Sequence, residues 1–204
     1  MKIAIIGSRN VGITLGRIWS KAGNDIVFGV RENTNSGISK LNDENLDRVS
    51  ITTIPMAIQE ADWIMLGIPY SAVEDVMQVN AKTINGKVII DATNRYGDKE
   101  ISIPDLIQMY APDSQVFRAF NAMGWENVAN PKLGSQVLDI FYTGPDIEER
   151  KIMDKLISDT GGRPIWIGDN DLTSLSENLE NLWVTLAFDR EMGRRIGFKI
   201  LRDE

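Results

Sequence analysis

The residues best suited to chemistry lie in a glycine-containing turn near the start of the chain. Residues 2–16 read KIAIIGSRNVGITLG, in which a short apolar run ends at Gly7 and a segment with helical periodicity follows. Such a turn between a strand and a helix binds dinucleotide pyrophosphates, because the helix N-terminus offers unpaired N–H groups and a partial positive charge. Arg9 stands where the usual G-x-G-x-x-G pattern has its middle glycine. The turn therefore predicts a dinucleotide site with an altered phosphate loop.

Each part of this turn has its own expected role. Gly7 permits the tight exit from the strand, and Gly12 lets the helix pack closely on the sheet. Arg9 allows two interpretations: its guanidinium lies along a phosphate, or it is an exposed side chain in a degenerate turn. The predicted phosphate-binding residues are Gly7, Ser8, Arg9, Asn10, Val11 and Gly12.

The end of the second predicted strand distinguishes the two nicotinamide cofactors. A carboxylate about 20 residues beyond the glycines binds the ribose of NAD, whereas an arginine accommodates the 2′-phosphate of NADP. Arg31 follows Val30 and lies 19 residues after Gly12. Val30 and Arg31 therefore predict NADP. NAD stays the alternative, with Glu32 as the ribose ligand, and Arg31 would then be a surface loop residue.

Three further strand ends carry residues that suit the nicotinamide half of such a cofactor. In a doubly wound sheet, ligands lie beyond the carboxyl ends of the strands. Asn121 can offer its amide to a ribose, a carboxamide or a substrate, although asparagine at a strand end is often only a turn former. Trp125 offers a flat face for a ring, although such a tryptophan more often packs internally. The predicted cofactor residues here are Gly67, Ile68, Pro69, Tyr70, Ala92, Thr93, Asn94 and Asn121, and the candidates near hydride transfer are Asn121, Met123 and Trp125.

The elements that must position these residues alternate along the chain. Strands are expected at 2–6, 25–30, 49–53, 63–68, 87–91, 115–120, 137–143 and 164–167, and helices at 10–22, 55–60, 71–80, 104–110, 145–160 and 171–201. Residues 33–47 are polar and predict a loop with a weak helix. This alternation predicts an α/β fold, a Rossmann-like doubly wound, mostly parallel sheet with C-terminal helices. We expect one domain over 1–204, in which the helical segment 171–204 packs on that domain or on a dimer partner.

Composition excludes several classes of chemistry. The 204 residues include no histidine and no cysteine, which rules out histidine general bases, thiolate catalysis and the commonest metal sites. The net charge of −7 disfavours nucleic acid as a partner, yet residues 1–31 carry a net charge of +4. That local excess suits an anionic ligand. With no targeting or membrane-spanning segment in the sequence, we expect a cytoplasmic protein without a metal.

These motifs together are similar to one known family. The segments 7–12, 29–31, 67–69, 91–94, 117–121 and 182–183 resemble the NADP-dependent deazaflavin reductases, known as coenzyme F-420-dependent NADP oxidoreductases. The resemblance implies that the glycine turn binds pyrophosphate, that Arg31 binds the 2′-phosphate, and that the nicotinamide meets a flavin-like ring. The chain departs from the family pattern at Arg9, and at Val30 and Glu32, where the family has a small polar and a basic residue.

The leading hypothesis is an NADP(H)-dependent oxidoreductase that transfers hydride between the nicotinamide and a flavin, deazaflavin or similar small acceptor. Such a reaction needs chiefly positioning, because the cofactors carry the chemistry, so no catalytic residue is assigned. Two alternatives remain: a reductase of a small imine or keto acid, and a non-catalytic NADP(H)-binding regulatory protein. A homodimer is expected in each case.

Overall fold

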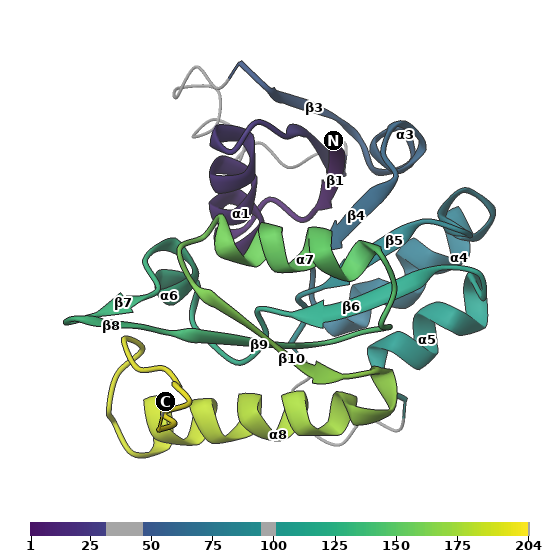
Figure 1. The fold of residues 1–204 in the computed structure, drawn as a ribbon. Coiled ribbons are helices and arrows are strands. Elements are labelled where there is room, and N and C mark those ends of the chain that lie inside the picture. The colour runs from purple at the N-terminus through teal and green to yellow at the C-terminus, as the bar shows by residue number, and fades with distance from the viewer. Residues whose placement is uncertain (32–46, 95–100, 204) are drawn as a thin grey trace. The chain divides into compact units, whose positions relative to one another are not determined.

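The computed structural model describes residues 1–31, 47–94 and 101–203, which form two compact units, Met1–Phe117 and Arg118–Glu204. Strands and helices alternate in both units (Figure 1). The predicted α/β fold with a mostly parallel sheet is confirmed. That residues 1–204 form a single domain stays a prediction. The expected loop at 33–47 lies almost wholly outside the described residues.

The first unit contains the glycine turn at the centre of its sheet. Its strands are β1 (Lys2–Ile6), β2 (Asp25–Val30), β3 (Val49–Thr53), β4 (Trp63–Leu66), β5 (Val88–Asp91) and the start of β6 (Gln115–Ala119), in the order β6-β5-β4-β1-β2-β3. β1 pairs in parallel with β2 and with β4, so that Ile6 lies opposite both Gly29 and Leu66. The carboxyl ends of the three central strands therefore meet at one edge.

Helices cover both faces of this sheet. They are α1 (Asn10–Lys21), α3 (Ile54–Glu60), α4 (Val73–Ile84) and α5 (Ile103–Tyr110). A helix is expected at 71–80, and α4 begins two residues later and ends four residues later than that. A 3-10 turn at Tyr70–Ala72 precedes it. The expected strand at 63–68 ends at Leu66, because the chain turns where the Gly67 N–H donates to the Ile6 carbonyl, 2.9 Å away.

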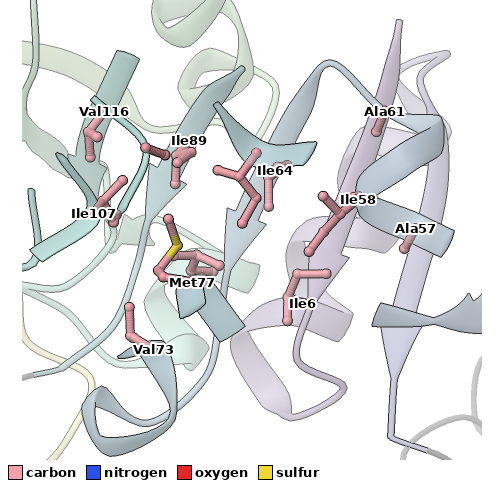
Figure 2. Packing of buried hydrophobic residues seen from close by; sticks show 14 of the residues in the cluster. Ile6, Ala57, Ile58, Ala61, Ile64, Val73, Met77, Ile89, Ile107 and Val116 are labelled. Atoms are coloured by element: carbon pink, nitrogen blue, oxygen red, sulfur yellow. The ribbon is translucent and has the colours of Figure 1, made fainter. Parts of the chain in front are cut away.

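Successive side chains along the strands point to opposite faces of the sheet, so the core of the first unit has one part on each face. Ile6 belongs to a buried cluster that includes Ile58 of α3, Ile64 of β4 and Met77 of α4 (Figure 2). Ile5, one residue earlier, lies under α1, where it is near the positions that side chains on Gly12 and Gly16 would occupy. Successive side chains of a strand point to opposite faces, so β1 connects the two halves of the core.

The second unit has a smaller sheet and a long helix. The end of β6 pairs antiparallel with β9 (Asp139–Thr143), and β9 pairs in parallel with β10 (Arg163–Gly168). The helices are α6 (Trp125–Ala129), α7 (Glu149–Ser158) and α8 (Thr173–Val184), and α8 continues as a π-helical turn over Thr185–Asp189. A short hairpin joins β7 (Lys132–Leu133) to β8 (Gln136–Val137). Neither α6 nor this hairpin was among the expected elements.

The expectation of a helix continuing to about residue 201 is wrong. Helical structure ends at Asp189, and Glu191 and Gly193 then adopt positive φ values of 53° and 76°, which interrupt helical hydrogen bonding. The following residues run along β9 instead: the Phe198 carbonyl accepts from the Asp139 N–H at 3.0 Å. The Ile200 N–H donates to the Asp139 carboxylate at 2.7 Å. These contacts replace the hydrogen bonds that a longer helix would have made.

Candidate cofactor-binding site

The turn between β1 and α1 is built by close backbone contact that only glycine allows. Gly7 has a φ of +125°, and a Cβ added there would collide with the carbonyl group of Gly67. A Cβ on Gly12 would collide with the Gly7 carbonyl oxygen. Gly12 thus holds α1 against the turn, and Gly7 holds the turn against the end of β4. This backbone cradle is the arrangement expected of a phosphate-binding turn.

The N-terminus of α1 follows this turn directly and offers backbone N–H groups that can bind an anion. Arg9 is the N-cap residue, and its carbonyl accepts the first helical hydrogen bond from the Ile13 N–H at 2.9 Å. The Arg9 side chain makes no capping hydrogen bond, and the first turn contains no acidic residue. The early N–H groups of α1 and the positive end of its dipole therefore suit an anion.

A pocket of about 410 Å³ lies over the turn, within the first unit. It brings together nine of the predicted cofactor residues: Gly7, Ser8, Arg9, Asn10, Val30, Arg31, Gly67, Ile68 and Pro69. Its other lining residues, Ile6, Gly29, Ile13 and Ile54, were not predicted. The pairing of Ile6 with Gly29 explains two of these, because it sets both strand ends side by side. The ligand role of the nine predicted residues stays a prediction.

Two arginines give this pocket its positive charge. Arg9 and Arg31 both line it, and both side chains are exposed. Arg31 also lines a neighbouring pocket of about 390 Å³, together with Val30, Thr53, Ile54 and Pro55. A cation shared by two adjoining pockets is well placed for a phosphate at the junction of a long ligand. Glu32, the alternative ribose ligand, lies outside the described residues.

The other predicted residues of the first unit lie outside this pocket. Val11 and Gly12 belong to α1, where Gly12 is buried beneath the turn. Tyr70 begins the 3-10 turn after β4 and donates its hydroxyl to the Ile101 carbonyl at 3.1 Å. Ala92, Thr93 and Asn94 follow β5, and the Thr93 N–H donates to the Asp91 carboxylate at 2.9 Å. Leu66 pairs with Asp91, so both segments emerge at the same edge of the sheet as the glycine turn.

Asn121 lies in the second unit and is bound from several sides. It is 1% exposed, its amide nitrogen donates to the Ser176 carbonyl and the Glu180 carboxylate, each at 3.2 Å, and its amide oxygen accepts from the Ser176 hydroxyl at 2.9 Å. Glu180 also forms a buried ion pair with Arg118 at 3.3 Å. These contacts attach the end of β6 to α8. Its amide groups therefore serve the fold of the second unit.

Met123 and Trp125 follow Asn121 on the way into α6. Met123 is buried, and Trp125 is the first residue of α6 and is partly exposed. The neighbouring Gly124 is confined, because a Cβ there would lie 2.6 Å from the Glu126 carboxylate and 3.2 Å from the Trp183 ring. Arg194 binds both carboxylate oxygens of Glu126, at 2.7 and 3.0 Å, and lowers the pKa of that carboxyl. Met123 and Trp125, the two remaining candidates near hydride transfer, thus lie on a tightly packed turn.

Two findings concern the expected absences. Among the residues that the structure describes, no group of three or more Asp or Glu side chains could hold a metal ion. Across the same ranges, none of the helices has the length and apolar character that crossing a bilayer requires.

Comparison with known proteins agrees with this arrangement. Residues 2–95 match the family described as NADP oxidoreductase, coenzyme F420-dependent. The resemblance noted from the motifs is therefore confirmed over that segment. The segment contains the glycine turn, Arg31 and the ends of β4 and β5.

Similar solved structures extend the comparison to nearly the whole chain. A proposed F420-dependent NADP reductase from Arthrobacter sp. FB24 superposes with a TM-score of 0.83 at 20% identity, over 99% of this chain and 100% of that one. A reductive aminase from Aspergillus terreus in complex with NADPH has a TM-score of 0.71 at 17% identity, over 93% and 62%. These similarities establish the fold.

One curated enzyme also matches in sequence. Glycerol-3-phosphate dehydrogenase [NAD(P)+] of Ectopseudomonas mendocina is 22% identical over 125 residues, which are 56% of this chain. The match spans 37% of that enzyme, so little more than a third of its length is represented.

Proposed function

We propose that this chain is an NADP(H)-dependent oxidoreductase, which binds its cofactor in the pocket over the β1–α1 turn. The observation that carries the proposal is the combination of a glycine-only backbone cradle with two arginines in one pocket. The family match over residues 2–95 and the NADPH-bound reductive aminase of the same fold support it.

In this proposal each part of the pocket has a distinct task. The α1 N-terminus binds the pyrophosphate through backbone N–H groups, and Gly7 and Gly67 leave room for its close approach. Arg31 binds the 2′-phosphate and so selects NADP over NAD, while Arg9 adds a second cation near the phosphates. When bound, the reduced cofactor supplies a hydride. The protein then has to position two reactants and exclude water, which requires no histidine or cysteine.

The acceptor that we propose is a flavin, a deazaflavin or a similar small planar molecule. The family description names coenzyme F420, the deazaflavin that the motif resemblance implies, and the Arthrobacter relative is described as F420-dependent. We also propose a cytoplasmic location, since both reactants would be soluble small molecules. An alternative is reduction of a small imine or keto acid, which the likeness to the reductive aminase favours. The third candidate, a non-catalytic NADP(H)-binding regulatory protein, would share the pocket without turnover.

Steady-state oxidation of NADPH distinguishes these candidates. The purified protein is assayed with FMN, FAD, coenzyme F420 and a panel of small imines and keto acids, while NADPH binding is measured separately by calorimetry. Turnover with a flavin-type acceptor supports the proposal, and turnover confined to imines or keto acids supports the alternative. Tight NADPH binding without turnover on any acceptor would leave only the regulatory role.

Substitution of the arginines tests the cofactor assignment itself. Loss of a charged contact to phosphate costs about 1.5–3 kcal/mol, so Arg31→Ala should weaken NADPH binding roughly 10- to 100-fold and leave NADH binding nearly unchanged. Arg9→Gly should weaken the binding of both NADPH and NADH, because in this proposal the Arg9 side chain lies near the phosphates that the two cofactors share. Lys21→Ala removes an exposed cation at the other end of α1 and is the matched control. Equal effects of Arg31→Ala on NADPH and NADH would refute the 2′-phosphate role.

A further inference from the structure

The second unit has a pocket of its own, between the start of β10 and the chain that follows α8. Its volume is about 630 Å³, which is within the range of small-molecule sites. Among the residues that the structure describes, those that line it are Arg163, Lys199, Ile200, Leu201, Arg202 and Asp203. These residues do not line the pocket over the β1–α1 turn, so the proposed cofactor site leaves this cavity without a role.

Arg163 gives the pocket a cation whose orientation is fixed. Its Nε and Nη2 atoms donate to the two carboxylate oxygens of Asp139, at 2.6 and 2.7 Å, and Nη2 also donates to the Ile200 carbonyl at 2.9 Å. Asp139 is buried, whereas the Arg163 side chain is 43% exposed. Nη1 makes no hydrogen bond within the described part of the chain. Because the guanidinium is already held in place, Nη1 can bind a ligand with little further loss of side-chain entropy.

Two further cations line the same pocket. Lys199 donates one of its three N–H groups to the Val137 carbonyl at 2.9 Å, which holds its ammonium near the end of β8. The Arg202 side chain is exposed and makes no ion pair or hydrogen bond with any residue that the structure describes. The carboxylate of Asp203 and the buried carboxylate behind Arg163 reduce the positive charge of the three cations without cancelling it. The pocket therefore suits an anion, although the whole chain has a net charge of −7.

The rest of the pocket lining is apolar. Ile200 is 46% exposed and Leu201 is 81% exposed, and both lie between Lys199 and Arg202 in the sequence. A free inorganic ion would leave these two side chains in water, whereas a ligand with a small apolar body would cover them. An organic anion therefore matches the lining better than an inorganic one.

We propose that this pocket binds a phosphate monoester of a small apolar molecule. A phosphate monoester carries a charge of about −1.5 to −2 at pH 7, and its three acceptor oxygens match the three donors Arg163, Lys199 and Arg202. A carboxylate has a single charge and two oxygens, so it would leave one of these cations without an acceptor. Ile200 and Leu201 contact the apolar part of the ligand. This site does not depend on the proposed oxidoreductase activity.

Calorimetric titration with phenyl phosphate tests the site, since this probe joins a phosphate monoester to an apolar ring. The protein should bind it with a millimolar or lower dissociation constant, and inorganic phosphate more weakly. Arg202→Ala should weaken phenyl phosphate binding about 5- to 10-fold, because it removes a charged hydrogen bond. Arg190→Ala is the matched control, since Arg190 is an exposed arginine of the same unit that does not line the pocket. Absence of saturable binding, or equal effects of the two variants, overturns the proposal.

Two more variants test the apolar lining and the location of the bound probe. Leu201→Ser should weaken phenyl phosphate binding about threefold and leave inorganic phosphate binding unchanged, because only phenyl phosphate has an apolar body. Equal changes for the two probes would contradict the proposed ligand class. Arg31→Ala alters the pocket over the β1–α1 turn and should not change phenyl phosphate binding. If Arg31→Ala weakens it and Arg202→Ala does not, the probe binds in the first unit and the proposal is wrong. Circular dichroism of each variant checks that the fold is retained.

Discussion

Replacement of Gly12 by alanine isolates the contribution of the glycine cradle to cofactor binding. Gly12 lies in the first turn of α1, and a Cβ there would overlap the Gly7 carbonyl oxygen and lie 3.2 Å from Ile5 Cγ2. The obstructing oxygen belongs to backbone, which cannot rotate away as a side chain can. Relief requires that α1 and the β1–α1 turn separate, and this moves the N–H groups that are proposed to bind phosphate.

The expected size of the effect follows from two opposing terms. Alanine is favoured over glycine in a helix interior by up to about 1 kcal/mol. Overpacking of a close contact costs typically about 1–3 kcal/mol. The Gly12→Ala variant should therefore lose about 1–2 kcal/mol of stability, together with several degrees in Tm. A displaced turn should weaken NADPH binding by about tenfold or more, which corresponds to roughly 1.4 kcal/mol or more.

Gly16→Ala is the matched control, because it lies one turn further along the same helix. A Cβ on Gly16 would lie 2.5 Å from Phe28 Cζ and 3.1 Å from Ile5 Cδ1, so it overpacks side chains of the core rather than the turn. Thermal unfolding should show that both variants are destabilised. Calorimetry with NADPH should show weaker binding only for Gly12→Ala. If the two variants bind NADPH equally well, the cradle does not determine the cofactor affinity and the reasoning fails.

Two further predictions concern stability. Hydrogen bonding to Arg194 lowers the pKa of Glu126 from its ordinary value of 4.5, so the pair should stabilise the fold above that pH. Glu126→Gln should cost roughly 0.5–1 kcal/mol at pH 7, and urea unfolding at several pH values should show this difference disappearing as the pH falls through the lowered pKa. Ile64→Ala empties a fully buried position in the core shown in Figure 2 and should cost about 2–5 kcal/mol in urea unfolding with little change in NADPH affinity, which a tenfold loss of binding would contradict.

The first unit is predictable from sequence because its elements are determined by local patterns. Interior parallel strands are apolar on both faces, so β1 and β4 appear as short runs of apolar residues. The turn between β1 and α1 needs glycine at Gly7 for its backbone and at Gly12 for packing, and both needs can be recognised in the sequence. Arg9 and Arg31 lie within this local frame. Their presence in one pocket follows from the parallel pairing of β1 and β2.

The second unit was harder to predict because distant residues determine its irregular parts. Arg195 donates to the carbonyls of Glu126, Asn130 and Lys132, which fixes the short helix α6 and the start of the hairpin. The Asn127 amide donates in return to the carbonyls of Arg194 and Ile196. These contacts span more than 60 residues and leave no periodic pattern. They also explain why the chain after Asp189 is not helical although its residue types allow a helix.

Asn121 shows why residue type and position at a strand end cannot by themselves assign a ligand. Its place after β6 suits a cofactor contact as well as a structural one, and both interpretations were open. Its contacts come from α8, where Ser176 and Glu180 bind the donor and acceptor groups of its amide, and a role of Asn121 toward a cofactor stays a prediction. Arg9 and Arg31 have exposed side chains that line the pocket over the β1–α1 turn. A strand-end residue is therefore a strong ligand candidate when its polar groups face a preformed pocket, and a weaker one when distant elements have already bound them.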